Sequence, residues 1–312
     1  MKDLNKFLWV MVGWAVWDAL WAPVEFRRID EFDWVTDYQE CDRFRLSPWE
    51  WTDDTAMALL LADSLIRCKG FDIEDQLNNY YKRHNTWYMW LKPYPDGEWG
   101  QVSRMMYAYE MYKNWAFTTK PREEDLSWEY MDWNWSLMRI WPIPLFYFED
   151  PEKALFYAWE SSKSTHHTDL CIDSCIYYTW LILWAMNWAS KKELMTPYYS
   201  PVKDYWKNHK IADKLKPIVE WSYKLKDRYQ INPSGYVVDT LETALRWFWM
   251  SESFKDWLEK VVNLWWDADT TWCIYWYLAW AYYWYDNIPE RWKEWLAERG
   301  RIEEVAKLLY EW

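Results

Sequence analysis

Two short segments of the sequence concentrate carboxylates and hydroxyls immediately before apolar runs. They are Thr52–Thr55 (TDDT) and Asp267–Thr271 (DADTT). Oxygen ligands without Cys or His favour a hard cation such as Mg²⁺ or Mn²⁺, and this many ligands suit a two-metal site. Asp and Thr are also preferred at helix N-termini, so the spacing alone leaves simple helix capping open. If the two helix starts converge, their aspartates repel one another unless cations lie between them.

The elements that must position these segments are predicted to be helices. Long apolar stretches with helical spacing are separated by polar loops that contain proline, and several stretches are apolar on nearly every side. The pattern predicts an all-α fold, a single large domain of orthogonally packed helices over residues 1–312. The helices are expected at 5–21, 54–68, 73–90, 101–114, 153–163, 169–189, 211–228, 239–249, 253–263, 270–285 and 290–310.

The chain is acidic, which restricts its partners. Its 312 residues carry a formal net charge of -13. Broad electrostatic binding to nucleic acid or to an anionic membrane surface is therefore disfavoured, although a local basic pocket is still compatible with this charge. The apolar N-terminal run is interrupted by Asp18 and Pro23 before it reaches the length of a membrane span, so we expect a buried first helix and no membrane partner.

The cysteines and tryptophans do not indicate a catalytic site, but they bear on the location of the protein and on the genetic code of its host. The five cysteines show no paired CxxC spacing, which argues against a disulfide framework or a zinc knuckle and favours a cytoplasmic location. The chain has 33 Trp and only 6 Gly. Several tryptophans, such as Trp133 and Trp135, occupy loop positions that usually need glycine. We therefore hypothesise that many tryptophan codons are UGA read as glycine in the natural host; the alternative is a truly Trp-rich or redesigned protein.

Six motifs occur together in one order along the chain. They are GWAVWDALWAPVEF (13–26), EWTDDTAMALLLADSL (50–65), WNWSLMRIWPIPL (133–145), STHHTDLCIDSC (164–175), SGYVVDTLETAL (234–245) and VNLWWDADTTWCIYWYLAWAYYW (262–284). In this order and with these residues the chain resembles the ADP-ribosylglycohydrolase family. Tryptophan stands where the family has glycine at several positions, including Trp17 and Trp21 of the first motif.

The resemblance implies two bound divalent cations, Mg²⁺ or Mn²⁺. Glu25 is then the residue that ligates or deprotonates the attacking water, although taken alone it reads as a surface carboxylate after a helix. The implied metal ligands are Thr52, Asp53, Asp54, Asp267, Asp269 and Thr270.

The same resemblance implies a set of substrate contacts in loops. Asn134 and Ser136 are expected to contact phosphate or ribose, a task that suits loops with exposed backbone N–H groups. His166 and Tyr236 are expected to contact the ligand as well, although a structural histidine and a core tyrosine fit the sequence equally. Glu98 stands in a loop, GEWGQVSRMM (97–106), where the family usually has Asp. The full implied set is Glu98, Gly100, Asn134, Ser136, His166, Gly235 and Tyr236.

The function that follows is hydrolysis of the glycosidic bond between ADP-ribose and a modified protein side chain, with arginine as the expected acceptor. The partner would be an ADP-ribosylated protein or a small molecule that contains ADP-ribose. The alternative is a member of the family that binds ADP-ribose without turnover or has a structural, crystallin-like role. A membrane-surface protein follows only from the tryptophan content, and the acidic charge opposes it.

Overall fold

The computed structural model describes most of the chain. The described residues are 2–25, 27, 31, 35–86, 132–198, 202, 205–227, 230–251, 271, 274–275, 278–279 and 288–312. Within these ranges the regular structure is helical, and two isolated β-bridges, Cys41 with Leu46 and Trp133 with Tyr236, are the only extended pairings. The prediction of an all-α fold is therefore confirmed, whereas the domain limits 1–312 stay a prediction.

Several of the long helices begin where a polar side chain accepts a hydrogen bond from a backbone N–H of the first turn. Thr52, Asp150 and Thr168 cap three of them in this way. Each cap gives a partner to one backbone N–H that has none within the helix. The long helices are α1 (Leu4–Trp21), α2 (Asp53–Cys68), α3 (Ile73–Thr86), α7 (Pro151–Lys163), α8 (Asp169–Met186), α13 (Val237–Met250) and α17 (Arg299–Glu311).

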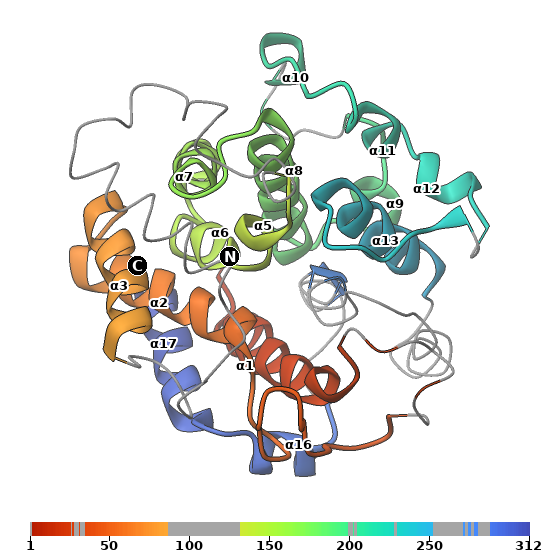
Figure 1. Cartoon of the computed structure of the whole chain (residues 1–312). Coiled ribbons are helices and arrows are strands. Elements are labelled where there is room, and N and C mark those ends of the chain that lie inside the picture. Colours follow the sequence, from red (N-terminus) through yellow and green to blue (C-terminus); the bar gives the residue numbers. More distant parts are fainter. Residues whose placement is uncertain are drawn as a thin grey trace.

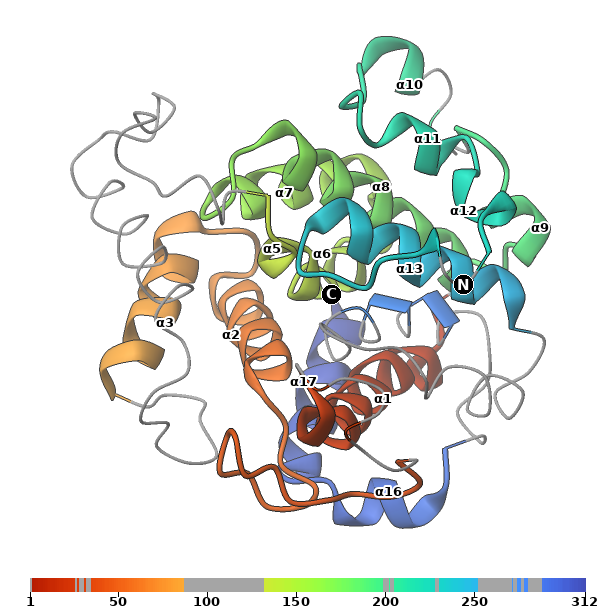
Figure 2. The same cartoon turned by 45° about the vertical axis from the view of Figure 1, so that its right-hand side comes forward.

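Short helices connect these long ones and turn the chain between them. A single 3-10 turn, η1 (Ala22–Val24), follows α1 directly. The other short elements are α5 (Trp135–Met138), α6 (Pro142–Phe146), α9 (Lys191–Leu194), α10 (Tyr205–Asn208), α11 (Lys216–Val219), α12 (Ser222–Leu225) and α16 (Glu290–Trp295). Figures 1 and 2 show α10, α11 and α12 following one another along one side of the molecule, beside α8 and α13.

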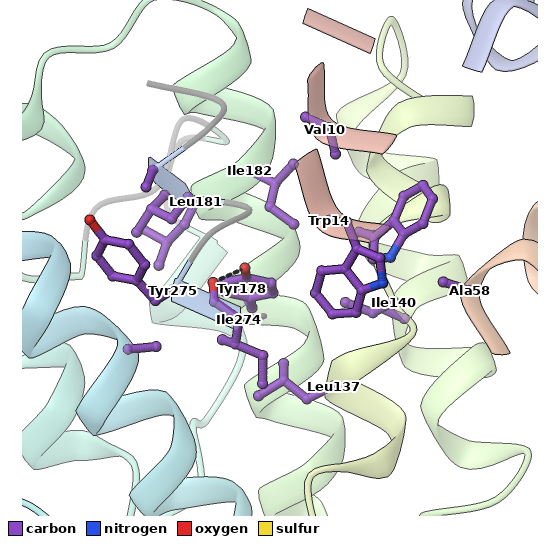
Figure 3. Packing of buried hydrophobic residues seen from close by; sticks show 14 of the residues in the cluster. Val10, Trp14, Ala58, Leu137, Ile140, Tyr178, Leu181, Ile182, Ile274 and Tyr275 are labelled. Carbon is purple, nitrogen blue, oxygen red and sulfur yellow. Dashed lines mark hydrogen bonds between the residues drawn. The ribbon is translucent and has the colours of Figure 1, made fainter. Parts of the chain in front are cut away.

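The core forms around α1 and α8, which are apolar on nearly every side and almost wholly buried. α1 packs along α17 (Figures 1 and 2), and near the two ends of the chain Lys2 Nζ donates to the carbonyl of Tyr310 at 3.3 Å. Figure 3 shows Trp14 of α1 among core residues that include Ile140 and Ala58. In the same view the hydroxyl of Tyr178 donates to the carbonyl of Ile274, which ties α8 to a distant part of the sequence.

For two stretches of the sequence, the prediction of one continuous helix is wrong. The stretch 211–228 contains α11 and α12, separated by Trp221, whose φ of 76° lies in the left-handed region and ends any α-helix. The stretch 290–310 is divided into α16 and α17 at Glu298, with a φ of 56°. The expected helices at 101–114 and 253–263 lie outside the described residues, as does most of 270–285.

The first helix is the only described one that is long and apolar enough to span a membrane. Its window, Leu4–Val24, is 94% buried inside the protein, as expected for a core helix. The described cysteines are free thiols, and Cys171 and Cys175 are small buried residues of α8, as their spacing suggested.

Candidate functional site

The first acidic segment lies at the N-terminus of α2, where the structure confirms that capping occurs. Thr52 is the N-cap and its hydroxyl accepts from the backbone N–H of Asp54 at 3.3 Å, while Asp53 and Asp54 occupy the first turn. Thr52 and Asp54 are buried, and Asp53 is half-buried. Helix capping explains why Thr52 is present, but one capping side chain is enough for a helix N-terminus. Two further carboxylates in the same turn, one of them 2% exposed, are more than a cap requires.

Asp18 of α1 holds this turn in place. Its Oδ1 accepts from the backbone N–H of Thr52 at 2.8 Å, and its Oδ2 accepts from both the backbone N–H and the hydroxyl of Thr55, at 2.9 and 2.6 Å. Burial raises the pKa of Asp18 to about 6, and the hydrogen bonds from Thr55 and Thr52 act in the opposite direction. These bonds join the last turns of α1 to the start of α2. Glu25, half-buried, follows α1 directly after η1.

The second group of expected site residues is formed by two loops that pair with each other. Trp133 bridges to Tyr236, and the backbone N–H of Asn134 donates to the carbonyl of Gly235 at 2.9 Å. The side-chain amide of Asn134 donates to Thr240 at 3.0 Å, so this side chain is engaged inside the protein. Asn134 is only 1% exposed. The pairing places the loop before α5 against the start of α13.

Buried hydrogen bonds continue from this loop toward His166. Ser136 is fully buried and its Oγ accepts from Ser162 at 3.0 Å. His166 is 2% exposed, its Nδ1 shares a hydrogen bond of 2.9 Å with Thr165 Oγ1, and the ring of Trp135 meets its imidazole edge-on at 5.7 Å. Arg139 donates to the carbonyl of Trp135 at 2.7 Å and also to the hydroxyl of Thr165. Arg139 therefore connects the 133–136 loop with the histidine.

A family model described as ADP-ribosylglycohydrolase matches residues 1–312. The chain belongs to the ADP-ribosylglycohydrolase family. The sequence is 29% identical to the ADP-ribosylarginine hydrolase Tri1 of Serratia proteamaculans, covering 99% of this chain and 80% of that protein. It is 26% identical to the ADP-ribosyl-dinitrogen reductase glycohydrolase of Rhodospirillum rubrum, covering 92% of this chain and 89% of that protein. A solved structure named as an ADP-ribosylglycohydrolase-related protein complex matches with a TM-score of 0.79 and 29% identity, covering 99% of this chain and 98% of that one.

The expected site residues of this family member divide into two described groups, Glu25, which is described directly after η1, and residues outside the described ranges. The first group is Thr52, Asp53 and Asp54 at α2, and the second contains Asn134, Ser136, His166, Gly235 and Tyr236. Glu98, Gly100, Asp267, Asp269 and Thr270 lie outside the described ranges. All of the assigned roles therefore stay predictions.

The donor set at α2 fits a hard divalent cation by its chemistry. Thr52, Asp53 and Asp54 offer only hydroxyl and carboxylate oxygens, which Mg²⁺ and Mn²⁺ prefer, and neither sulfur nor imidazole accompanies them in this turn. Among the described residues no group of three or more His, Cys, Asp or Glu side chains is arranged to hold a metal ion. The remaining expected ligands belong to the Asp267–Thr270 segment.

Two residues that organise the site were not assigned a role from the sequence. Asp18 is the single acid in a helix whose residues 7–21 are otherwise apolar, and that isolation is a signal of a buried, specifically bonded carboxylate. Arg139 closes the motif WNWSLMR, and it is 1% exposed. A buried arginine must have partners, so both residues could have been singled out as positioning groups.

Proposed function

We propose that this protein is a divalent-cation-dependent hydrolase that releases ADP-ribose from a modified protein side chain, with arginine as the acceptor. The observation that carries the proposal is the turn of hard oxygen donors at α2, fixed to α1 by the three hydrogen bonds to Asp18. Membership of the family and the similarity to ADP-ribosylarginine hydrolases support the choice of bond and acceptor.

The chain's own residues have distinct tasks in this proposal. Asp18 keeps Thr52, Asp53 and Asp54 in place, and these three would hold the cations together with Asp267, Asp269 and Thr270. When bound, Mg²⁺ or Mn²⁺ would supply Lewis acidity toward ribose hydroxyls and lower the pKa of a water. Glu25 would accept the proton of the attacking water. The bond from the anomeric carbon to the guanidine nitrogen breaks through an oxocarbenium-like state, the water oxygen bonds to that carbon, and the proton that Glu25 accepts passes to the leaving guanidine nitrogen.

The substrate end of the site would be formed by the paired loops. Arg139, bonded to the Trp135 carbonyl and to Thr165, keeps the 133–136 loop next to His166. Because the side chains of Asn134 and Ser136 are buried and bonded internally, backbone groups of this loop are the better candidates for ligand contact.

The test is release of ADP-ribose from ADP-ribosylarginine by wild type and by Asp54→Asn. We expect turnover by wild type and a loss of at least about a hundredfold in the variant, because one carboxylate ligand becomes neutral. Lys307→Gln, on the exposed face of α17, is the control for surface charge and should keep full activity. No release from arginine, serine or small-molecule linkages would overturn the proposal.

A second candidate is a member that binds ADP-ribose without cleaving it. The indoles of Trp133 and Trp135 favour it, because they meet at 5.2 Å in a loop where the family motif has glycines, and bulky side chains there narrow the approach of a ligand. Calorimetric binding of ADP-ribose combined with no turnover on any linkage is the result that this candidate predicts.

A further inference from the structure

The guanidinium of Arg139 is held in one place by groups from two helices. Arg139 is the C-terminal cap of α5 and donates to the carbonyl of Trp135 at 2.7 Å. The ring of Tyr80, on α3, lies 5.2 Å from the guanidinium carbon. Tyr80 is itself fixed by Gln76, whose amide donates to the Tyr80 hydroxyl at 2.8 Å. The arginine is therefore a rigid, buried group from which further hydrogen bonds can be oriented.

A chain of buried hydrogen bonds leads from this arginine to His166. A terminal nitrogen of Arg139 donates to the hydroxyl oxygen of Thr165, and the same oxygen lies 2.9 Å from His166 Nδ1. All three side chains are buried. Among the described residues, no other hydrogen bond reaches the Thr165 hydroxyl. The hydroxyl is therefore the single link between the guanidinium and the imidazole.

The chemistry of arginine sets the direction of this chain. A guanidinium has only N–H donors and no acceptor, so Thr165 Oγ1 must accept from Arg139. The hydroxyl proton then has His166 Nδ1 as its acceptor. If Nδ1 donated instead, the hydroxyl proton would be buried without an acceptor, which is unfavourable. A doubly protonated ring meets the same obstacle and adds a second positive charge beside Arg139.

We propose that Arg139 and Thr165 hold His166 as the neutral imidazole with its proton on Nε2, so that the ring presents a hydrogen-bond donor to an oxygen of the ADP-ribosyl group; the ligand part rests on the proposed function. Phosphate oxygens accept hydrogen bonds, and the opposite tautomer would present a lone pair that repels them. Arg139 and Thr165 act through the imidazole and are positioning residues.

Nitrogen-15 NMR of the histidine rings tests the tautomer without any substrate. The chain has four histidines, so the set of signals lost in His166→Gln assigns this ring. At about pH 8, above the ordinary pKa of an imidazole, we expect wild type to show a protonated Nε2 and an unprotonated Nδ1. Thr165→Val keeps the shape of the side chain without the hydroxyl and should give a mixture of both tautomers, and Thr165→Ser should restore the wild-type signature.

Two further variants separate the arginine from a general effect of buried substitutions. Arg139→Met removes the donor that orients the Thr165 hydroxyl, so it should also give a mixture of tautomers. Thr179→Val is the matched control, because Thr179 is a buried threonine of α8 outside this chain of hydrogen bonds. It should keep the proton of His166 on Nε2.

Calorimetric titration with ADP-ribose in the presence of Mg²⁺ tests the consequence for the ligand. We expect Thr165→Val to bind about fivefold more weakly than wild type, because a ring that is partly in the other tautomer and free to turn is no longer preorganised. Thr165→Ser and Thr179→Val should bind ADP-ribose as wild type does. Equal affinities of wild type and Thr165→Val would overturn the ligand part of the proposal.

Failure of this proposal and failure of the proposed activity have different signatures. A proton on Nδ1 of His166 in wild type, or an unchanged tautomer in both Thr165→Val and Arg139→Met, would overturn the role of the two positioning residues even if ADP-ribosylarginine is hydrolysed. If hydrolysis is absent, NMR and calorimetry still decide both parts, since neither needs turnover. If wild type does not bind ADP-ribose, the ligand part is overturned with the proposed function, whereas the tautomer is still decided by NMR.

Discussion

Asp18 is the residue on which the geometry of the acidic turn depends. Asp18→Ala removes the acceptor for two backbone N–H groups and one hydroxyl, all buried, and we expect it to lower the free energy of unfolding by about 2–3 kcal/mol. The release of ADP-ribose should fall at least about tenfold, because the turn that carries Asp53 and Asp54 loses its anchor. Chemical denaturation and the hydrolysis assay measure the two effects.

A matched acid distinguishes this effect from a general loss of charge. Glu304 is exposed on α17, so Glu304→Ala should change the free energy of unfolding by less than about 0.5 kcal/mol and leave activity unchanged. Equal effects of the two substitutions would show that Asp18 has no special positioning role.

The tryptophans at positive φ bear on the identity of the encoded residues. Of the seven described non-glycine residues with positive φ, three are Trp49, Trp188 and Trp221, at 78°, 67° and 76°. A bulky side chain costs roughly 1–2 kcal/mol in the left-handed region, whereas glycine adopts it freely. We therefore predict UGA codons at these positions in the source gene, UGG at Trp51 and Trp292, and glycine in peptides of the natural protein by mass spectrometry. UGG codons at all three positions would exclude the hypothesis that these tryptophans are glycines in the natural protein.

At the scale of elements, Asp173 of α8 binds the segment between α10 and α11 and makes stability depend on pH. The pKa of this carboxyl is raised to about 6, mainly by burial and to a smaller extent by Asp169, while the hydrogen bond from the N–H of Ala212 and the charge of His209 act in the opposite direction. Since the folded state then binds more protons than the unfolded state between the ordinary pKa of 3.8 and about 6, the free energy of unfolding should fall as the pH rises through that window. Asp173→Asn keeps an oxygen for the Ala212 N–H but removes the charge.

Urea denaturation of wild type and Asp173→Asn across this pH window measures the coupling. The variant should be the more stable protein above about pH 6 and should show a smaller decrease between the two ends of the window. If the free energy of unfolding changes with pH equally in the two proteins, Asp173 is not the cause of the pH dependence.

At the scale of the whole molecule, the features that could be predicted from the sequence are those that depend on residues close together in the chain. The all-α fold and the N-terminus of α2 could be predicted because they depend on local periodicity and on contiguous polar residues such as Thr52 and Asp54. The role of Asp18 could not, because it arises from the packing of α1 on α2 across 34 residues of sequence. The breaks at Trp221 and Glu298 were missed because no glycine marks these left-handed positions.

The substrate end of the site depended on long-range packing in the same way. The Asn134 loop and Gly235 are about a hundred residues apart in the sequence, and only the backbone pairing between them brings the two motifs together. The expectation that Asn134 and Ser136 contact the ligand came from motif similarity, which carries no information on burial. Both side chains are buried and bonded inside the protein.

The most direct test of the proposed hydrolase is metal removal and restoration. Protein treated with EDTA and then dialysed should release no ADP-ribose from ADP-ribosylarginine, and added Mg²⁺ or Mn²⁺ should restore the rate, whereas Asp269→Ala should stay inactive in either metal. Circular dichroism before and after treatment checks that the helices persist. Full hydrolysis in the presence of EDTA, with no response to either cation, would contradict the central claim.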